Sequence, residues 1–285
     1  MLYWQAAVLG VVEGLTEFLP VSSTGHLTIA ERALGLRTDD PGTTAFTAIV
    51  QVGAIGAVLA SFRADIVRLA RAWFRGLRHV GARAESDYRL AWCVVVGSVP
   101  VGVAGFAARD LVAGPLRSLW VVAAGLILWS AVMVAAERFA AARAARGSAV
   151  RGEERLSLRD AVWIGLVQCL ALVPGVSRSG ATISAGLFRG LDRVTATRIS
   201  FFLSVPALTA AGAYEALSAG GDVARTVGWG PTLLGTLVSL VVAHVAIAWL
   251  LRFVAHHRIS VFAGYRVGLG LLLVVLLSTG AVAPL

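Results

Sequence analysis

The sequence contains no lysine and no asparagine, only two cysteines, and few charged residues: 14% of its 285 residues. Cys93 and Cys169 lie in apolar stretches far apart in the sequence, which excludes a disulfide framework and a paired-cysteine metal site. Lysine and asparagine are missing together while alanine, glycine, valine and arginine are abundant, which indicates a GC-rich coding bias. We therefore attach no chemical meaning to the absence of lysine.

Apolar residues dominate what is present. They make up 58% of the chain, and the mean hydropathy is +0.80, which no ordinary water-soluble domain of this size shows. A net charge of +9 fits either a nucleic-acid-binding protein or a membrane protein with basic cytoplasmic loops. The long apolar runs favour the membrane protein, so we expect no nucleic-acid partner.

Six apolar segments are each about long enough to cross roughly 30 Å of hydrocarbon as a helix. They comprise residues 45–62, 90–108, 118–136, 199–217, 229–251 and 259–279. Two further apolar segments, 2–19 and 161–173, run into breaks rich in Pro, Gly and Ser, a pattern typical of re-entrant hairpins. We therefore expect an all-α polytopic membrane protein with six transmembrane helices and two re-entrant helical hairpins. The N-terminal segment lacks the features of a cleaved leader, and we expect the mature protein to keep it.

The arginines orient the chain. Residues 63–89 contain seven arginines and residues 138–159 contain six, and the short turn 252–258 is also basic. Connections 109–117 and 218–228 contain fewer. Basic loops stay in the cytoplasm, so the three basic segments 63–89, 138–159 and 252–258 are predicted to be cytoplasmic. The other two connections and the C-terminus are then predicted to lie outside. Contact of these arginines with anionic membrane lipids is compatible with this orientation.

Shifting the sequence by 155 positions superimposes the two breaks without a gap: Gly10 meets Gly165, and Ser22 meets Ser177. We predict one membrane domain, 1–285, built from repeats of approximately 1–137 and 160–285 joined by the basic loop 138–159. In the predicted orientation the two copies are inverted, so their hairpin tips meet near the midplane. Many transporters are built in this way, so a carrier or flippase for lipid phosphates remains the alternative function.

Glu13 and Glu17 lie four residues apart within an apolar segment, so on a helix they share one face. Ionised carboxylates are costly in hydrocarbon, and a like-charged pair requires a cation, an arginine or a shared proton. The alternative is a pair of glutamates that snorkel from a helix end. We interpret the pair as the centre of a site.

A polar cluster follows the first break: Ser22, Ser23, Thr24 and, after a glycine, His26. Any one of the hydroxyls could simply cap a helix. His26 lies three residues after Ser23, close enough to reach its hydroxyl and to exchange protons as a general acid or base. By contrast, His244, inside the fifth apolar segment, is interpreted as a packed histidine.

The second break places Arg178 in an apolar hairpin, among the hydroxyls of Ser177, Ser179 and Thr182. A guanidinium at this depth needs anionic partners, and its planar fork suits a phosphate. The site also coincides with the expected start of a helix, where free N–H groups favour an anion. The alternative is an arginine that only pairs with one of the two glutamates for stability.

Together the two breaks supply carboxylates, an imidazole, hydroxyls and an arginine. Carboxylates and phosphate oxygens are the usual ligands of Mg²⁺ or Ca²⁺, so the set indicates metal-assisted phosphoryl transfer. Because the site lies in a membrane, the substrate is predicted to be a lipid phosphate.

At this point the chain resembles the undecaprenyl-diphosphate phosphatases of bacteria, the bacitracin-resistance type. The resemblance rests on Glu-Gly-Leu-Thr-Glu-Phe-Leu-Pro-Val-Ser-Ser-Thr-Gly-His at 13–26 and Pro-Gly-Val-Ser-Arg-Ser-Gly-Ala-Thr at 174–182, and covers essentially the whole chain. It implies hydrolysis of the C55 isoprenyl diphosphate to its monophosphate at the outer face of the bacterial plasma membrane. This reaction recycles the carrier lipid for peptidoglycan synthesis and confers bacitracin resistance, since bacitracin competes for the substrate.

The resemblance and the residue chemistry together give a set of site residues. We expect Glu13, Glu17, Ser23, His26 and Arg178 to be catalytic, Ser22, Thr24, Ser177, Ser179 and Thr182 to bind substrate with Arg178, and the two glutamates to hold Mg²⁺ or Ca²⁺. Two mechanisms remain open: attack by Ser23 with His26 managing its proton, or attack by a metal-activated water. A homodimer also remains open.

Overall fold

The computed structural model describes residues 1–37, 40–114, 116 and 118–283, and this part of the chain is helical without a strand. The α-helices are α1 (Tyr3–Thr16), α2 (Ser23–Ala33), α3 (Pro41–Ser61), α4 (Arg63–Arg78), α5 (Ser86–Ala107), α6 (Arg109–Ala113), α7 (Leu119–Ala145), α8 (Leu158–Gln168), α9 (Arg178–Phe188), α10 (Arg193–Thr226), α11 (Trp229–His256) and α12 (Val261–Ser278). Short 3₁₀ segments are η1 (Val80–Ala84), η3 (Glu153–Arg155) and η4 (Cys169–Leu172).

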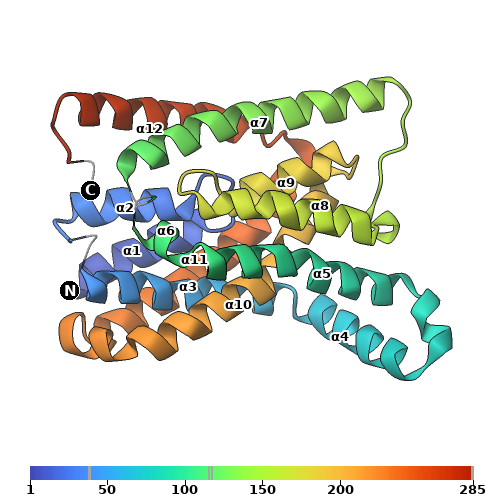
Figure 1. The fold of residues 1–285 in the computed structure, drawn as a ribbon, viewed down its shortest axis with the longest axis horizontal. Helices are drawn as coiled ribbons and strands as arrows, with labels where there is room; N and C mark the ends of the chain where they lie inside the picture. Colours follow the sequence, from blue (N-terminus) through green and yellow to red (C-terminus); the bar gives the residue numbers. More distant parts are fainter. Residues whose placement is uncertain (38–39, 115, 117, 284–285) are drawn as a thin grey trace.

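Five of the long helices are apolar enough to cross a membrane: α3, α5, α7, α11 and α12. They run along the long axis of the molecule (Figure 1). The predicted class, an all-α polytopic membrane protein, is confirmed, and five of the six predicted spans coincide with these helices. The sixth, residues 199–217, falls within α10, where the side chains of residues 211 and 214–217 lie outside the described part.

Local sequence explains where several helices begin. Asp40 precedes α3 and accepts a hydrogen bond from the Thr43 backbone N–H, with a proline at the first helical position. Asp192 caps α10 in the same way through the Thr195 N–H. Each cap satisfies a backbone donor that has no partner inside the helix.

Two pairs of short helices, α1 with α2 and α8 with α9, enter the molecule from opposite ends (Figure 1). Helix α1 starts at the end that carries both termini, and α8 starts at the other end. Their connecting turns meet between the long helices. Close glycine contacts bring each pair onto a long helix, because a Cβ at Gly10 would lie 2.5 Å from the Gly235 carbonyl of α11, and one at Gly165 would lie 2.2 Å from the Gly97 carbonyl of α5.

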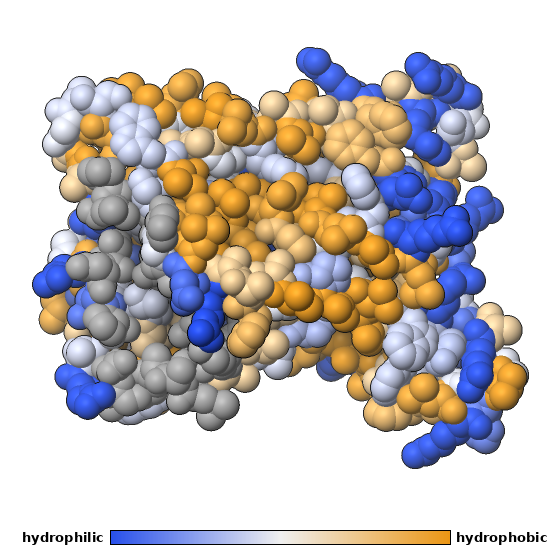
Figure 2. All heavy atoms as spheres, viewed as in Figure 1, coloured by the Kyte–Doolittle hydropathy of each residue, from blue (hydrophilic) through white to orange (hydrophobic). Residues whose placement is uncertain are grey.

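The surface divides into an apolar middle and a basic end. Figure 2 shows hydrophobic residues over most of the length, and strongly hydrophilic ones gathered at the end with α4 and the α7–α8 connection. The arginines of segments 63–89 and 138–159 therefore lie at one end, as predicted, while both termini lie at the other. An apolar surface between polar ends is what a bilayer requires.

Two buried acids stabilise the basic end. Asp160 is fully buried and accepts hydrogen bonds from Arg151 at 2.5 Å and Arg189 at 2.7 Å. Glu137 of α7 is also buried and is held by Arg193 at 2.7 Å. Each carboxylate thus has the cationic partner that burial of a charge demands.

A cluster of phenylalanines packs beside the turn that follows α1. The Phe18 ring meets Phe201 edge-on at 5.3 Å, and Phe62 meets Phe202 at 5.3 Å. Phe18, Phe201 and Phe202 are almost completely buried. This packing fixes the backbone next to Glu17 against α10.

Candidate active site

Two serines of matching conformation end the two turns. Ser22 has a φ of 78° and Ser177 a φ of 76°, and they are the two non-glycine residues with positive φ in the described part of the chain. Each stands directly before a helix, α2 or α9. Residues other than glycine rarely adopt a positive φ. They keep it where the surrounding structure imposes it, often at functional sites.

The two turns bond directly to each other. The Gly175 N–H donates to Ser22 Oγ at 3.1 Å, and Ser179 Oγ donates to the Leu19 carbonyl at 3.0 Å. Gly175 has a φ of 94°, and a Cβ there would lie 2.3 Å from the Val122 carbonyl of α7, so only glycine fits. The predicted meeting of the two breaks is therefore observed.

A fully buried arginine from α12 joins both turns. Arg266 donates to the Pro20 carbonyl of the first turn at 3.1 Å and to the Gly175 carbonyl of the second at 2.8 Å. It also donates to the Val176 carbonyl at 3.2 Å and to Ser130 Oγ of α7 at 3.1 Å. Carbonyl groups in a turn have no helical partner, so the guanidinium satisfies acceptors that burial would otherwise leave unpaired.

The sequence analysis did not single out Arg266. It lies in the predicted span 259–279, and its side chain is buried completely. The available signal was a single arginine within an otherwise uncharged span.

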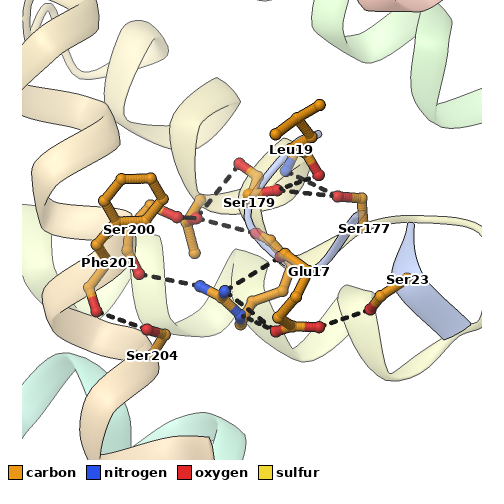
Figure 3. A network of polar contacts seen from close by, with 11 residues as sticks. Glu17, Leu19, Ser23, Ser177, Ser179, Ser200, Phe201 and Ser204 are labelled. Atoms are coloured by element: carbon orange, nitrogen blue, oxygen red, sulfur yellow. Dashed lines mark hydrogen bonds and ion pairs between the residues drawn. The ribbon is translucent and has the colours of Figure 1, made fainter. Parts of the chain in front are cut away.

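Glu17 forms the centre of the polar network (Figure 3). Its Oε1 faces the Arg178 guanidinium, 3.2 Å from Nη2, and its Oε2 accepts a hydrogen bond of 2.6 Å from Ser23 Oγ. All three side chains are partly or largely buried. One carboxylate thus connects the arginine of the second turn to the serine of the first helix pair.

Arg178 is held on its other side by α10. Its Nη1 donates to the Ser200 carbonyl at 3.0 Å, and its guanidinium lies 5.7 Å from the centre of the Phe18 ring. Thr182 Oγ1 donates to Ser200 Oγ at 2.7 Å. The guanidinium is therefore fixed in position, with 13% of its side chain exposed.

The serines of the second turn support the start of α9. Ser177 Oγ accepts from the Gly180 N–H at 3.2 Å, so Ser177 is the helix cap, and it lies 3.1 Å from Ser179 Oγ. Both hydroxyls are buried. In this structure these two hydroxyls, predicted to bind substrate, serve as a helix cap and as turn contacts.

Glu13 stands apart from this network. It is buried, and neither carboxylate oxygen has a hydrogen-bond partner among the described residues. A buried carboxylate without a partner is costly, so its surroundings suit a cation that is bound to oxygen ligands. One helical turn separates Glu13 from Glu17, so a divalent ion could take oxygens from both, although no cluster of three His, Cys, Asp or Glu side chains occurs in the described part.

The sequence predicted that His26 reaches the Ser23 hydroxyl, but its ring nitrogens bond to other groups. Its Nδ1 lies 2.7 Å from the Ser22 carbonyl, and its Nε2 lies 2.6 Å from the hydroxyl of Tyr265. A carbonyl only accepts, so Nδ1 carries the proton, and Nε2 accepts from Tyr265. Sequence spacing alone could not show this, because Ser23 turns toward Glu17 and Tyr265 comes from a distant helix.

The remaining site residues behave differently from one another. Ser22 accepts from Gly175, and Thr182 bonds to α10, so both are part of the joined turns. Thr24 is exposed on the first turn of α2, and its side chain makes no hydrogen bond to a described residue. His244 is not packed as expected: it is exposed on α11 and lies 2.9 Å from Ser61 Oγ.

The chain is similar to one protein family over nearly its whole length. Residues 6–272 match the family described as "Bacitracin resistance protein BacA". The chain is 55% identical over 279 residues to "Undecaprenyl-diphosphatase 3" of Frankia casuarinae, with 98% of each chain covered. It is 51% identical over 289 residues to "Undecaprenyl-diphosphatase" of Cutibacterium acnes (99% of each), and 52% identical over 277 residues to the protein of that name from Acidothermus cellulolyticus (97% of each).

Proposed function

The chain belongs to the bacitracin resistance protein family, and from that premise we propose that it is an undecaprenyl-diphosphate phosphatase of the bacterial plasma membrane. The reaction is hydrolysis of the C55 isoprenyl diphosphate to the monophosphate and inorganic phosphate. The full-length similarity to proteins named for this reaction supports it. So does the joining of two turns into one buried polar site between membrane helices.

The observation that carries the mechanism is the shared Glu17 carboxylate. Ser23 Oγ lies 2.6 Å from Glu17 Oε2, which supports a mechanism in which Glu17 rather than His26 accepts the serine proton. In this proposal Ser23 Oγ attacks the terminal phosphorus, the bond to the bridging oxygen breaks, and the lipid monophosphate leaves. Water then hydrolyses the phosphoserine, and Glu17 returns the proton to Ser23.

Arg178 has two roles in this scheme. In the absence of substrate it neutralises Glu17, from which it lies 3.2 Å. Its planar fork suits two oxygens of the terminal phosphate, and Ser177, Ser179 and Thr182 keep the start of α9 in place beneath it. The start of α9 adds the positive end of a helix dipole, which favours the charge of a diphosphate.

Glu13 and Glu17 would hold the Mg²⁺ or Ca²⁺ of the reaction. The unpartnered oxygens of Glu13 support this assignment. A bound divalent cation would supply charge neutralisation for the diphosphate. The chain's own residues supply the remaining functions: Arg178 orients the phosphate, and Glu17 handles the proton of Ser23.

We also propose the finer topology: six spans and two re-entrant hairpins in an inverted repeat, with the site open to the outer face. Three pairs of residues 155 positions apart support a repeat: Ser22 and Ser177 share a conformation, Gly10 and Gly165 both approach a long helix, and the Pro20 and Gly175 carbonyls both accept from Arg266. Labelling of a Thr24→Cys variant by an impermeant maleimide in intact cells tests the outward side, with Arg146→Cys as the cytoplasmic control.

Release of phosphate from C55 diphosphate by the purified protein tests the function. We expect metal-dependent release by the wild type and almost none from Glu17→Ala or Arg178→Ala. Release that both variants retain in full would contradict the assignment and leave the carrier as the better function. Retention of configuration at a chiral terminal phosphorus is expected for the phosphoserine route, whereas inversion would favour direct attack by water.

A further inference from the structure

Helix α4 forms an arm at the arginine-rich end of the molecule (Figure 1). Together with η1 it links α3 to α5, two of the helices able to span a membrane. One side of α4 packs inward: Leu69, Ala72 and Gly76 are buried, and a Cβ at Gly76 would lie 2.3 Å from the Tyr88 ring of α5. This side therefore attaches the arm to the rest of the protein.

The opposite side of α4 is exposed and forms a groove of about 630 Å³. Val67, Arg71, Phe74, Arg75 and Arg78 line it. Phe74 is 55% exposed and Val67 is 45% exposed. The groove thus combines apolar side chains, open to the surroundings, with guanidinium groups on the same helical face.

The four arginines of α4 that follow Arg63 fall into two groups. Arg68 bonds to Asp65 and Asp87, and Arg75 pairs with Glu85 at 2.6 Å. Arg71 and Arg78 make no hydrogen bond or ion pair with a described residue, and both are exposed at the groove. Seven residues separate them, so on a helix they lie two turns apart, roughly 10 Å, on one face.

Aromatic residues place the arm at the membrane–water interface. Trp73 of α4 packs against Trp92 of α5 at 5.8 Å, and Tyr88 lies next to Trp92 at 6.4 Å. Tryptophan and tyrosine gather at the level of lipid headgroups. At this depth the basic and apolar side chains on one face of a helix can contact lipid headgroups and acyl chains respectively.

We propose that this groove of α4 binds an anionic glycerophospholipid of the cytoplasmic leaflet. Its phosphate lies between the guanidiniums of Arg71 and Arg78, and its acyl chains cover Phe74 and Val67. Charge complementarity supports this occupant, since two cations without partners face a leaflet that carries negative charge. A second copy of the chain fits less well, because the protein has a net charge of +9 and two arginine-rich ends would repel.

Retention of phosphatidylglycerol tests the proposal. The full chain is reconstituted in nanodiscs of phosphatidylcholine with or without phosphatidylglycerol, and bound lipid is counted by native mass spectrometry. We expect Arg71→Gln/Arg78→Gln to lose roughly twentyfold in preference for phosphatidylglycerol, since each arginine near an anionic surface contributes a factor on the order of five. The control, Arg155→Gln/Arg159→Gln, removes two exposed arginines from the same end of the molecule and should keep the preference.

Two further measurements distinguish lipid binding in the groove from nonspecific attraction of anionic lipid to positive charge. Phe74→Ser leaves every charge in place and should still lower lipid retention, and phosphatidylglycerol should slow amide exchange in α4 of the wild type. Phosphate release by the α4 double variant should stay at the wild-type level, because none of its residues belongs to the active site. Equal lipid loss in the control variant, or protection of α4 that depends on protein concentration and not on phosphatidylglycerol, would overturn the proposal.

Discussion

Ser23 Oγ lies 2.6 Å from one oxygen of the Glu17 carboxylate, and Arg178 Nη2 lies 3.2 Å from the other. The two contacts come from different turns, separated by more than half of the chain. Glu17 therefore connects the group that attacks to the group that binds the phosphate. Its charge serves both, because an ionised carboxylate accepts the serine proton and holds the buried guanidinium in place.

Replacing Glu17 by Gln should reduce phosphate release by about two to four orders of magnitude, the usual cost of losing a general base. The amide keeps the shape of the side chain, so the fold is expected to persist. The measurement is single-turnover phosphate release alongside thermal unfolding. Glu154→Gln, at an exposed glutamate, is the control and should behave as the wild type.

Glu13→Gln should separate stability from activity. Without divalent cation the variant is expected to unfold at a higher temperature than the wild type, because it removes a buried carboxylate that has no partner. Phosphate release should fall, and its dependence on Mg²⁺ or Ca²⁺ should be lost. Glu137→Gln is the matched contrast: this buried glutamate is paired with Arg193, so its unfolding temperature should drop. A lower unfolding temperature for Glu13→Gln in EDTA would contradict the cation assignment.

Arg266→Lys should lower both stability and activity. A lysine ammonium keeps the charge but lacks the planar fork, so it leaves carbonyls of the two turns without donors. Each buried carbonyl left without a donor costs about 1–3 kcal/mol. Thermal unfolding and phosphate release in detergent measure the two effects, and Arg252→Lys, at an exposed site, should change neither. Full activity in Arg266→Lys would show that the turns hold together without this arginine.

Tyr265→Phe removes the hydroxyl that donates to His26 Nε2. We expect kcat/KM to fall by roughly fivefold, the equivalent of one hydrogen bond of about 1 kcal/mol. In combination with His26→Ala the loss should not add, because both variants remove the same contact. The control is Tyr88→Phe, whose ring packs on Trp92. Strictly additive losses would mean that Tyr265 acts independently of His26.

The buried ion pairs of Asp160 should make the stability of the protein depend on pH in acid. Burial alone would raise the pKa of Asp160, but hydrogen bonds from Arg151, Ser157 and Arg189 outweigh it and hold the pKa well below its ordinary value. The stabilisation is therefore fully present above the unfolded pKa of about 3.9 and is lost as the pH falls toward the lower folded pKa. The contribution of Asp160 to the unfolding temperature of the wild type should be constant above about pH 5 and should fall steeply at lower pH.

Asp160→Asn should be less stable at neutral pH by about 3 kcal/mol and show a shallower loss in acid. Arg159→Gln alters the neighbouring residue on an exposed face and provides the control. Equal acid sensitivity of Asp160→Asn and the wild type would assign the effect to other carboxylates.

The sequence was sufficient for the class of the fold and for the meeting of the two breaks, because both follow from long-range patterns of hydropathy and from glycine and serine at fixed spacing. Contacts between distant helices were beyond it. The spacing of His26 and Ser23 suggested a pair, but the left-handed Ser22 turns Ser23 toward Glu17. The partner of His26 is Tyr265, more than two hundred residues away.

Arg266 shows a different limit. The sequence shows a single arginine in an apolar span, but the mean hydropathy of the span stays high and gives no sign of its role. Its meaning depends on acceptors that the sequence does not announce: backbone carbonyls of Pro20, Gly125, Gly175 and Val176. Only the three-dimensional arrangement shows that these carbonyls converge on one side chain.

The position of Arg266 in the last helix has a consequence for biosynthesis. Residues 1–258 contain both turns and every proposed catalytic side chain, yet they lack the donor that joins the turns. A ribosome-bound chain therefore carries an incomplete centre until α12 is inserted. We therefore expect a chain terminated before Arg266 to lack the link between the two turns and to be inactive.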